Sequence, residues 1–232
     1  MHVTAIVLAA GAGRRIGADI SKTYLSIAGR ALVLRVLDRM FAAKAVEEVI
    51  LVVAENDLAR CDALLRGDGA LCNRPWVLQS GGPTRQQSAR RGLEKVSALA
   101  DIVVIHDGAR PFVSAALIER LVEAAVEKGA VVAGLPVRDT IKVVGSGGLI
   151  QSTPDRRSLW EIQTPQVFRR ELIVAAHEAA QKSEIEATDD AMVVERFGKP
   201  VFVLAGERSN IKITLPEDVW LAEMMIREGR VP

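Results

Sequence analysis

The sequence has few of the residues on which several common kinds of site depend. It contains two cysteines, Cys61 and Cys72, and three histidines among 232 residues. The cysteines lie outside any spacing typical of a metal site, so we expect free thiols in a reducing compartment rather than a disulfide or a zinc centre. We find no Ser-His-Asp or Cys-His arrangement that would indicate a nucleophilic triad.

Net charge is also nearly absent. Thirty basic side chains face 29 acidic ones, which gives a formal net charge of +1. The balance indicates no overall attraction to nucleic acid or to a membrane surface, so any positively charged site must be local. No apolar run approaches the roughly 20 residues needed to cross a bilayer, and the first residues have the pattern of a strand rather than of a signal peptide. We therefore expect a cytoplasmic protein.

What the chain does have is an alternation of strand-like and helix-like runs. Continuous apolar runs predict strands buried on both faces, at residues 3–9, 47–54, 75–80, 101–107, 130–137 and 200–206. Helical spacing predicts helices at residues 31–43, 57–67, 84–99, 116–129, 169–182 and 188–198, and a last helix that starts with a capping box at Thr214–Glu217. This pattern predicts a doubly wound α/β fold with a mostly parallel sheet.

The pattern changes near residue 139. Residues 138–165 alternate as strands do, turn at Gly145–Gly148 and contain no helical spacing, which predicts a β-hairpin arm projecting from the sheet. Its apolar side chains, Trp160 among them, need a cover. That cover is either a second subunit, which makes a homodimer, or the chain's own body if the hairpin folds back. Because no linker or repeat interrupts the sequence, we expect one domain, residues 1–232, with this arm.

A loop nearly free of long side chains follows the first strand. The stretch AAGAGRRIG lacks the third glycine of a dinucleotide fingerprint at Ile16, and it lacks the Lys-Ser/Thr pair of a P-loop after Gly17. Its backbone N–H groups can nevertheless approach an anion closely, and two arginines add charge. A plain turn with solvated arginines is the alternative, and it would be favoured if this loop stood alone.

Two further polar clusters follow predicted strands, where α/β sheets bind ligands. The first, SGGPTRQQS, is another loop poor in large side chains, and the second is HDGARP at residues 106–111. Asp107 ends an apolar strand, where a carboxylate is costly unless it is paired or bound to a cation. It could cap the next helix, but Ser114 is better placed for that. We therefore predict that Asp107 is a magnesium ligand.

These blocks together resemble one family. The blocks that carry the resemblance are, in chain order, AAGAGRRIG, SKTYL, GGPTRQQS, HDGARP, PVRDTIK, DRRSLWEIQTPQ, TDD and SNIKITLPED. Over residues 4–225 the chain resembles the 2-C-methyl-D-erythritol 4-phosphate cytidylyltransferases, which implies a Rossmann-like nucleotidyltransferase fold. The chain departs from the family pattern at Ser21, Thr23 and Pro83, although Lys22 is retained.

The resemblance implies a reaction and a set of site residues. CTP and a sugar-alcohol phosphate, methylerythritol phosphate, would give CDP-methylerythritol and pyrophosphate, with Mg²⁺ near Asp107 bridging phosphate oxygens. The residues implied around the α-phosphate, as catalytic groups, are Arg15, Lys22 and Lys212. Those implied for the nucleotide are Ala9, Ala10, Gly11, Gly13, Gly81, Gly82, Ser88 and Asp107. Those implied for the second substrate are Asp107, Arg110, Thr140, Arg156, Thr164, Thr188 and Lys212.

The implied chemistry agrees with the absence of a triad. A phosphate monoester has a second pKa of about 6, so it is largely dianionic at pH 7 and needs no general base. The obstacle is repulsion between two anions, which cations must offset. Thr140 and Arg156 lie on the arm, where they would complete the neighbouring subunit's site, whereas Thr188 could equally cap a helix.

Two other functions fit the same pattern. One is cytidylyl transfer to ribitol 5-phosphate, but the DRRSLWEIQTPQ block favours methylerythritol phosphate as the acceptor. The other is a nucleotide-binding regulator without activity, which predicts loss of the charged site residues that are in fact present.

Overall fold

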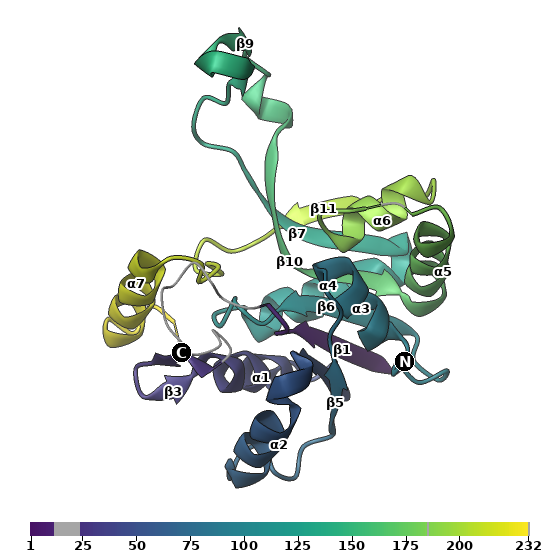
Figure 1. The fold of residues 1–232 in the computed structure, drawn as a ribbon, viewed down its shortest axis with the longest axis vertical. Coiled ribbons are helices and arrows are strands. Elements are labelled where there is room, and N and C mark those ends of the chain that lie inside the picture. The colour runs from purple at the N-terminus through teal and green to yellow at the C-terminus, as the bar shows by residue number, and fades with distance from the viewer. Residues whose placement is uncertain (12–23, 185, 232) are drawn as a thin grey trace.

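The computed structural model describes residues 1–11, 24–184 and 186–231. Within them lies a seven-stranded sheet in the order β11-β7-β10-β6-β1-β4-β5 (Figure 1). Its strands are β1 (Val3–Leu8), β4 (Glu48–Val53), β5 (Trp76–Ser80), β6 (Ile102–Asp107), β7 (Ala130–Pro136), β10 (Trp160–Arg169) and β11 (Phe202–Ala205). Only β10 among these strands runs antiparallel to its neighbours. The predicted mostly parallel sheet is confirmed.

Helices cover both faces of this sheet, because alternate strand residues point to opposite sides. On one face Val7 of β1 packs in a cluster with α1, α2 and α4, and on the other Ile6 packs in a cluster with α3, α5 and α6. The helices are α1 (Leu32–Ala42), α2 (Leu58–Gly67), α3 (Arg85–Leu93), α4 (Ala115–Lys128), α5 (Arg170–Lys182), α6 (Asp190–Arg196) and α7 (Pro216–Arg227). The doubly wound arrangement is therefore confirmed.

Apolar spacing decides which side of each helix faces the sheet. In α1 the residues Val33, Val36, Leu37 and Met40 are fully buried, and their spacing of three and four residues places them on one face. Each such side chain contributes about 1.5–3 kcal/mol when it leaves water. At the end of α4, Gly129 takes a φ of 84°, a left-handed conformation that glycine adopts without strain. The chain then enters β7 directly.

Among the helix boundaries that differ from the prediction, two have a clear local cause. The helix predicted over residues 84–99 is α3, which ends at Leu93, and the chain continues in turns closed by Lys95 N–H to Gly92 O and Val96 N–H to Leu93 O. These bonds close a tighter turn than an α-helix, so the helical pattern does not propagate. The last helix has Leu215 rather than Thr214 at its N-cap, and the Asp218 carboxylate accepts from both backbone N–H groups at 2.8 and 2.7 Å.

Helix α7 packs beside the main sheet rather than on either face of it. It covers the short hairpin of β2 (Ser26–Ile27) and β3 (Arg30–Ala31), in a cluster that includes Ile27, Phe112, Ile213 and Ala222. Ile213 is fully buried there, and its N–H donates to Ala109 O at 2.8 Å. The cluster thereby fixes the segment before α7 against the loop that follows β6.

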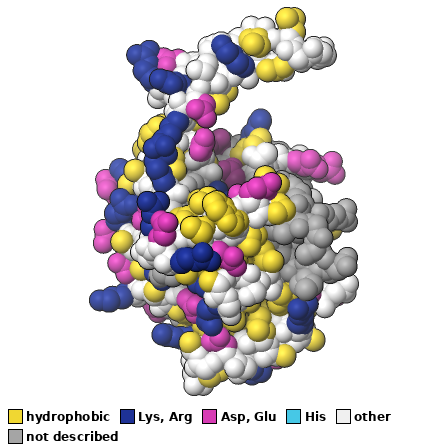
Figure 2. Space-filling view, turned by 90° about the vertical axis from the view of Figure 1, so that its left-hand side faces the viewer, with side chains coloured by type: hydrophobic (Ala, Val, Ile, Leu, Met, Phe, Trp, Pro, Cys, Tyr) yellow, Lys and Arg dark blue, Asp and Glu magenta, His cyan; other side chains and the backbone are white. Residues whose placement is uncertain are grey.

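The arm extends away from the body of the molecule (Figure 1). It carries a hairpin of β8 (Val143–Val144) and β9 (Ile150–Ser152), which turns through Ser146–Gly148. Hydrophobic side chains gather towards its free end (Figure 2), where Val144, Leu149 and Ile150 are 53%, 71% and 56% exposed. The projecting arm is confirmed, and the alternative in which it folds back on its own body is wrong.

Two simpler expectations concern cysteines and membranes. Cys61 is buried, Cys72 is exposed, and both are free. Burial raises the pKa of the Cys61 thiol to about 11, which keeps it protonated at neutral pH. None of the helices within the described ranges is long and apolar enough to cross a membrane.

Candidate functional site

The carboxyl ends of the central strands lie level with one another. Leu8 at the end of β1 pairs with Asp107 at the end of β6 and with Val52 of β4, while Val53 pairs with Ser80 of β5. The loops that leave these strands therefore start side by side, and we call this border the carboxyl edge. Backbone bonds continue past it, since Ala9 N–H donates to Val52 O at 2.7 Å. Ligands of parallel α/β sheets bind at such an edge.

The two loops predicted to hold the nucleotide are in contact. A Cβ on Gly81 would collide with the Cβ of Ala10 and lie 2.9 Å from the Ser88 hydroxyl, so only glycine fits there. Ser88 is buried, and its hydroxyl accepts from Gly82 N–H at 3.1 Å while lying 2.9 Å from Thr84 O. Ser88 therefore shapes the loop in this structure.

Asp107 is held between two cations from distant parts of the chain. Lys212 donates from Nζ to Oδ2 at 2.6 Å, and Arg85 donates from Nε to Oδ1 at 3.1 Å. Burial alone would raise the pKa of Asp107, but Arg85 and Lys212 hold it well below the usual value. The carboxylate is therefore ionised throughout the physiological range. Its side chain is 10% exposed and that of Lys212 is 42% exposed, so the lysine can reach a ligand.

Arg85 joins this pair to a second buried carboxylate. Its Nη1 donates to Oδ2 of Asp190 at 2.8 Å, and Oδ1 of Asp190 lies 3.1 Å from Nε2 of His177. Burial would raise the pKa of Asp190, but Arg85 and His177 lower it. Sequence reasoning assigned none of Arg85, Asp190 and His177 to the site. Arg85 and Asp190 do lie in the GGPTRQQS and TDD blocks, whereas nothing in the sequence singles out His177.

Thr164 reaches Asp107 because β10 bulges at this point. The register with β7 shifts between Ile162 and Gln166, and this irregularity redirects the residues between them. The Thr164 hydroxyl accepts from Asp107 N–H at 3.0 Å and lies 3.1 Å from Nδ1 of His106.

The hydrogen bonds of His106 define its tautomer. Nε2 lies 3.0 Å from Arg110 O, which can only accept, so Nε2 carries the proton and Nδ1 accepts from the Thr164 hydroxyl. Burial lowers the pKa of His106 to about 4, in agreement with a neutral ring. The Thr164 hydroxyl thus donates its proton to Nδ1 of His106.

Arg110 is fixed by the segment that carries Lys212. Its Nη1 donates to Asn210 O at 2.7 Å, and Asn210 Nδ2 donates to Thr164 O at 2.8 Å. Asn210 is fully buried, so these bonds occur out of contact with water. The structure thus brings together, from three separate segments of the chain, four of the residues that the resemblance implies for the second substrate: Asp107, Arg110, Thr164 and Lys212.

Three predicted residues lie outside this cluster. Thr140 and Arg156 are exposed on the arm, where Arg156 Nη1 donates to Arg138 O at 2.8 Å. Thr188 is exposed, and its hydroxyl contacts Met192 Sδ at 3.8 Å. The capping alternative for Thr188 is wrong, because the N-cap of α6 is Asp189, which accepts from Met192 N–H at 2.9 Å. The predicted Gly13, Arg15 and Lys22 lie outside the described residues.

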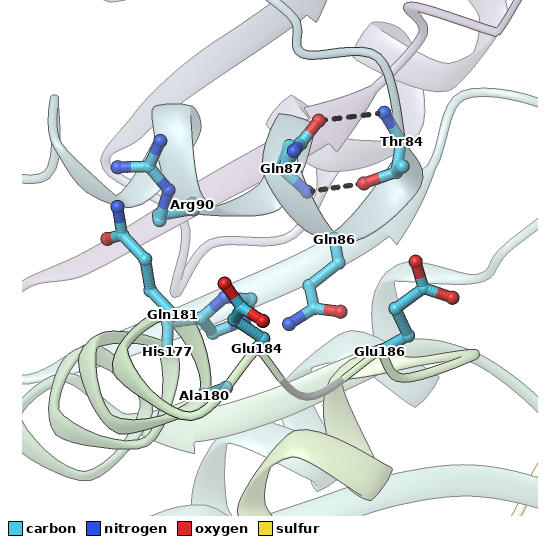
Figure 3. Close-up of a pocket in the computed structure, with 9 residues that line it drawn as sticks. All are labelled: Thr84, Gln86, Gln87, Arg90, His177, Ala180, Gln181, Glu184 and Glu186. Atoms are coloured by element: carbon cyan, nitrogen blue, oxygen red, sulfur yellow. Dashed lines mark hydrogen bonds between the residues drawn. The ribbon is translucent and has the colours of Figure 1, made fainter.

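A cavity of about 280 Å³ lies between the start of α3 and the end of α5 (Figure 3). The residues that line it are Thr84, Gln86, Gln87, Arg90, His177, Ala180, Gln181, Glu184 and Glu186. Thr84 and Gln87 form a capping box across the start of α3, with reciprocal bonds of 3.1 and 3.2 Å. The cavity shares His177 with the charged network around Asp190.

No group of three or more potential metal-binding side chains of the His, Cys, Asp or Glu type occurs within the described ranges. A carboxylate such as that of Asp107 nevertheless fits the chemistry of a nucleotide-bound Mg²⁺, since this ion is usually held by one or two carboxylates plus substrate phosphates. Its ionised state and its place at the carboxyl edge fit that use.

Sequence comparison places the chain among known proteins. Residues 3–228 match the family model described as 2-C-methyl-D-erythritol 4-phosphate cytidylyltransferase. The enzyme so named from Caldanaerobacter subterraneus is 40% identical, over 98% of this chain and 100% of that protein. The one from Pelotomaculum thermopropionicum is 42% identical, over 99% of this chain and 97% of that protein.

Solved structures agree with this placement. The 4-diphosphocytidyl-2C-methyl-D-erythritol synthase from Anaerococcus prevotii superposes with a TM-score of 0.86 at 31% identity, covering 97% of this chain and 98% of that one. The 2-C-methyl-D-erythritol 4-phosphate cytidylyltransferase from Thermus thermophilus superposes with a TM-score of 0.79 at 35% identity, covering 98% and 100%. With its fold and its sequence in agreement, this chain belongs to the 2-C-methyl-D-erythritol 4-phosphate cytidylyltransferase family.

Proposed function

We propose that this chain transfers the cytidylyl group of CTP to 2-C-methyl-D-erythritol 4-phosphate, in the isoprenoid pathway that uses this acceptor. An oxygen of the acceptor phosphate forms a bond to the α-phosphorus of CTP. The bond from that phosphorus to the bridging oxygen breaks, and pyrophosphate leaves with the electron pair. The observation that carries the proposal is the Lys212–Asp107–Arg85 contact at the carboxyl edge, in a chain that matches the family over nearly its full length.

The protein groups in this reaction bind, orient and neutralise charge. Because the acceptor phosphate is already dianionic near pH 7, no side chain has to remove a proton from it. Lys212 is the described cation best placed to leave its contact with Asp107 and meet a phosphate, because its side chain is 42% exposed. Arg15 and Lys22 are proposed to act beside it, and the backbone of Ala9–Gly11 and Gly81–Gly82 to hold the cytidine.

We propose Mg²⁺ as the metal and Asp107 as its protein ligand. When bound, Mg²⁺ would offset the charge of the triphosphate and of the departing pyrophosphate. Arg85 occupies one side of the Asp107 carboxylate and keeps it oriented. Each carboxylate oxygen can accept more than one contact, so the observed bonds to Arg85 and Lys212 leave coordination capacity.

The arm supports a further proposal, that the enzyme is a homodimer. Its apolar side chains are exposed along both strands, with Val143 at 43% and Ile150 at 56%. A monomer would leave this surface in water, whereas two arms that pack together would cover it. Arg156 and Thr140 would then contact the acceptor phosphate bound to the neighbouring subunit, while Arg110, Thr164 and Thr188 would act from the subunit's own body.

We also propose that residues 1–232 form a single domain that works in the cytoplasm. Both large core clusters lie against the same sheet, which supports one domain. The free cysteines are consistent with a reducing compartment.

A coupled assay of pyrophosphate release tests the reaction. The purified chain is offered CTP with methylerythritol phosphate or with ribitol 5-phosphate, in the presence of Mg²⁺. We expect turnover with methylerythritol phosphate. Replacing CTP with UTP should give little pyrophosphate release. Turnover with ribitol 5-phosphate alone would refute the choice of acceptor, and binding of CTP without turnover of either would indicate a regulator.

Sedimentation tests the dimer. Ile150→Asp places a charge on the exposed end of the arm and should shift the protein from dimer to monomer. Leu99→Asp is the matched control, since Leu99 is 82% exposed in the turn region after α3. A wild-type protein that sediments as a monomer at the concentration of the assay would refute the proposed dimer.

A further inference from the structure

A buried histidine lies at the far end of the charged network. His177 on α5 is 2% exposed, and its Nε2 lies 3.1 Å from Oδ1 of Asp190. Nδ1 has no hydrogen-bond partner among the residues that the structure describes. Nε2 must therefore carry the proton, since the Asp190 carboxylate can only accept.

The network runs unbroken from this ring to the proposed catalytic lysine. His177 holds Oδ1 of Asp190, Arg85 joins Oδ2 of Asp190 to Oδ1 of Asp107, and Lys212 holds Oδ2 of Asp107. Each carboxylate thus has two different partners, one on each oxygen. Arg85 bonds both carboxylates, with Nε donating to Asp107 and Nη1 donating to Asp190. Its Nη2 has no hydrogen-bond partner within the described ranges.

This arrangement makes the contact between Arg85 and Asp107 depend on His177. A buried carboxylate oxygen that loses its donor is costly, so Asp190 without His177 must find another partner. Arg85 already donates to Asp190, and its unpartnered Nη2 allows the bidentate contact with one carboxylate that arginine favours. Turning to make that contact would withdraw Nε from Asp107.

We infer that His177 is a positioning residue for cytidylyl transfer, which keeps Arg85 divided between Asp190 and Asp107 and so orients Asp107. The inference rests on the proposed role of Asp107 at the phosphates. His177 also lines the cavity between α3 and α5 (Figure 3).

Two polar replacements separate positioning from packing. In His177→Gln the amide nitrogen reaches about as far as Nε2 and can still donate to Asp190. In His177→Asn the amide reaches only as far as Nδ1 and cannot. We expect kcat/KM of the Asn variant to fall about tenfold, the lower end of what a hydrogen bond to a charged group supplies, and the Gln variant to stay within about threefold of wild type. His177→Met, which fills the space without a donor, should match Asn.

The assay is run well below the unfolding temperature of each variant, so that all molecules are folded. Equal activity of the Gln and Asn variants, whether both high or both low, would overturn the inference. The double variant His177→Asn, Asp190→Asn should have the same kcat/KM as Asp190→Asn alone, because His177 acts through the Asp190 carboxylate. Additive losses of kcat/KM would overturn the inference.

A crystal structure of His177→Asn gives a second test that needs no turnover. Arg85 Nε should have left Asp107 in favour of Asp190, whereas an unchanged Arg85 would refute the positioning role. An inactive wild-type protein would count against the proposed reaction, and the crystallographic test would still decide the role of His177.

Discussion

The carboxyl edge and the arm both carry predicted substrate contacts, but they hold them in different ways. At the edge, Asp107 is bound on both carboxylate oxygens, and Thr164 is buried with its hydroxyl engaged. On the arm, Thr140 and Arg156 are exposed, and the guanidinium of Arg156 meets a single backbone carbonyl among the contacts described for it.

The difference separates predicted contacts that the chain orients by itself from predicted contacts that it leaves exposed. Side chains at the edge are oriented before any ligand arrives, which reduces the cost of ordering them during the reaction. Side chains on the arm depend on what packs against them. We therefore expect substitutions at the edge to act within one subunit and substitutions on the arm to act across the proposed dimer.

Lys212→Ala should have the largest effect. Loss of one cation that stabilises the transition state lowers kcat by about 10²–10³-fold, and the fold should survive because the lysine side chain is 42% exposed. Steady-state pyrophosphate release measures the loss. Lys44→Ala, at an exposed lysine after α1, is the control and should retain wild-type kinetics. Normal turnover by Lys212→Ala would remove this lysine from the proposed mechanism.

Lowering the pH should reduce the folding stability of the protein, because His106 is buried at the carboxyl edge as a neutral ring. Its pKa is lowered to about 4 in the folded protein, so the unfolded chain, near 6.5, takes up the proton first as the pH falls. The stability that the neutral ring contributes is complete above pH 6.5 and is lost progressively down to about pH 4. The loss amounts to about 3 kcal/mol. Asp107, whose pKa is also lowered, contributes its own loss only at still lower pH.

Urea unfolding at a series of pH values measures this loss. His106→Gln removes the titrating ring and should flatten the dependence between pH 6.5 and 4, even if the variant is less stable at pH 7. His2 and His177 are present in both proteins, so the difference between them isolates His106. Identical pH profiles would show that His106 is not buried as a neutral ring.

Thr164→Val should cost about 2 kcal/mol of folding stability. The isosteric valine leaves Asp107 N–H without its acceptor and His106 Nδ1 without its donor. Thr164→Ser keeps the hydroxyl and should lose little. Thermal unfolding compares the two variants. If Val and Ser behaved alike, the hydroxyl would have no structural role, and direct contact with substrate would be its remaining use.

Arg156→Ala should reduce kcat/KM about tenfold, the smallest of these effects, because the variant loses the single exposed phosphate contact proposed for this arginine. Arg157→Ala is the neighbouring control, since Arg157 pairs with Asp155 on the same turn. Mixing Arg156→Ala chains with Lys212→Ala chains should restore part of the activity if each arm serves the other subunit. A mixture no more active than its components would place Arg156 in its own subunit's site or outside any site.

The fold could be predicted largely from the sequence, because its signals are local. Buried strands such as Val3–Leu8 are continuous apolar runs, and Gly129 ends α4 where the pattern says it should. The helix predicted to reach residue 99 stopped at Leu93 because the turns that follow it are closed by tighter backbone bonds. Apolar spacing alone does not distinguish such turns from helix.

The site could be predicted only in part. Asp107 and Lys212 are implied by the resemblance, and in the structure Lys212 Nζ lies 2.6 Å from Oδ2 of Asp107. His177 could not be found in this way, because a single histidine on an amphipathic helix has the same pattern whether it packs or hydrogen-bonds. Its partner Asp190 lies on another element, and only the packing of α5 against α6 and α3 brings the three side chains together.

One strand connects the two halves of this comparison. β10 ends the arm and also lies in the sheet between β7 and β6, and its bulge places Thr164 beside Asp107. Loop length near Ser146–Gly148 is free to vary without consequence for that placement. A single residue inserted or deleted between Ile162 and Gln166 would instead change the bulge that places Thr164 beside Asp107. Lineages that lengthen or shorten the arm should therefore do so at its tip.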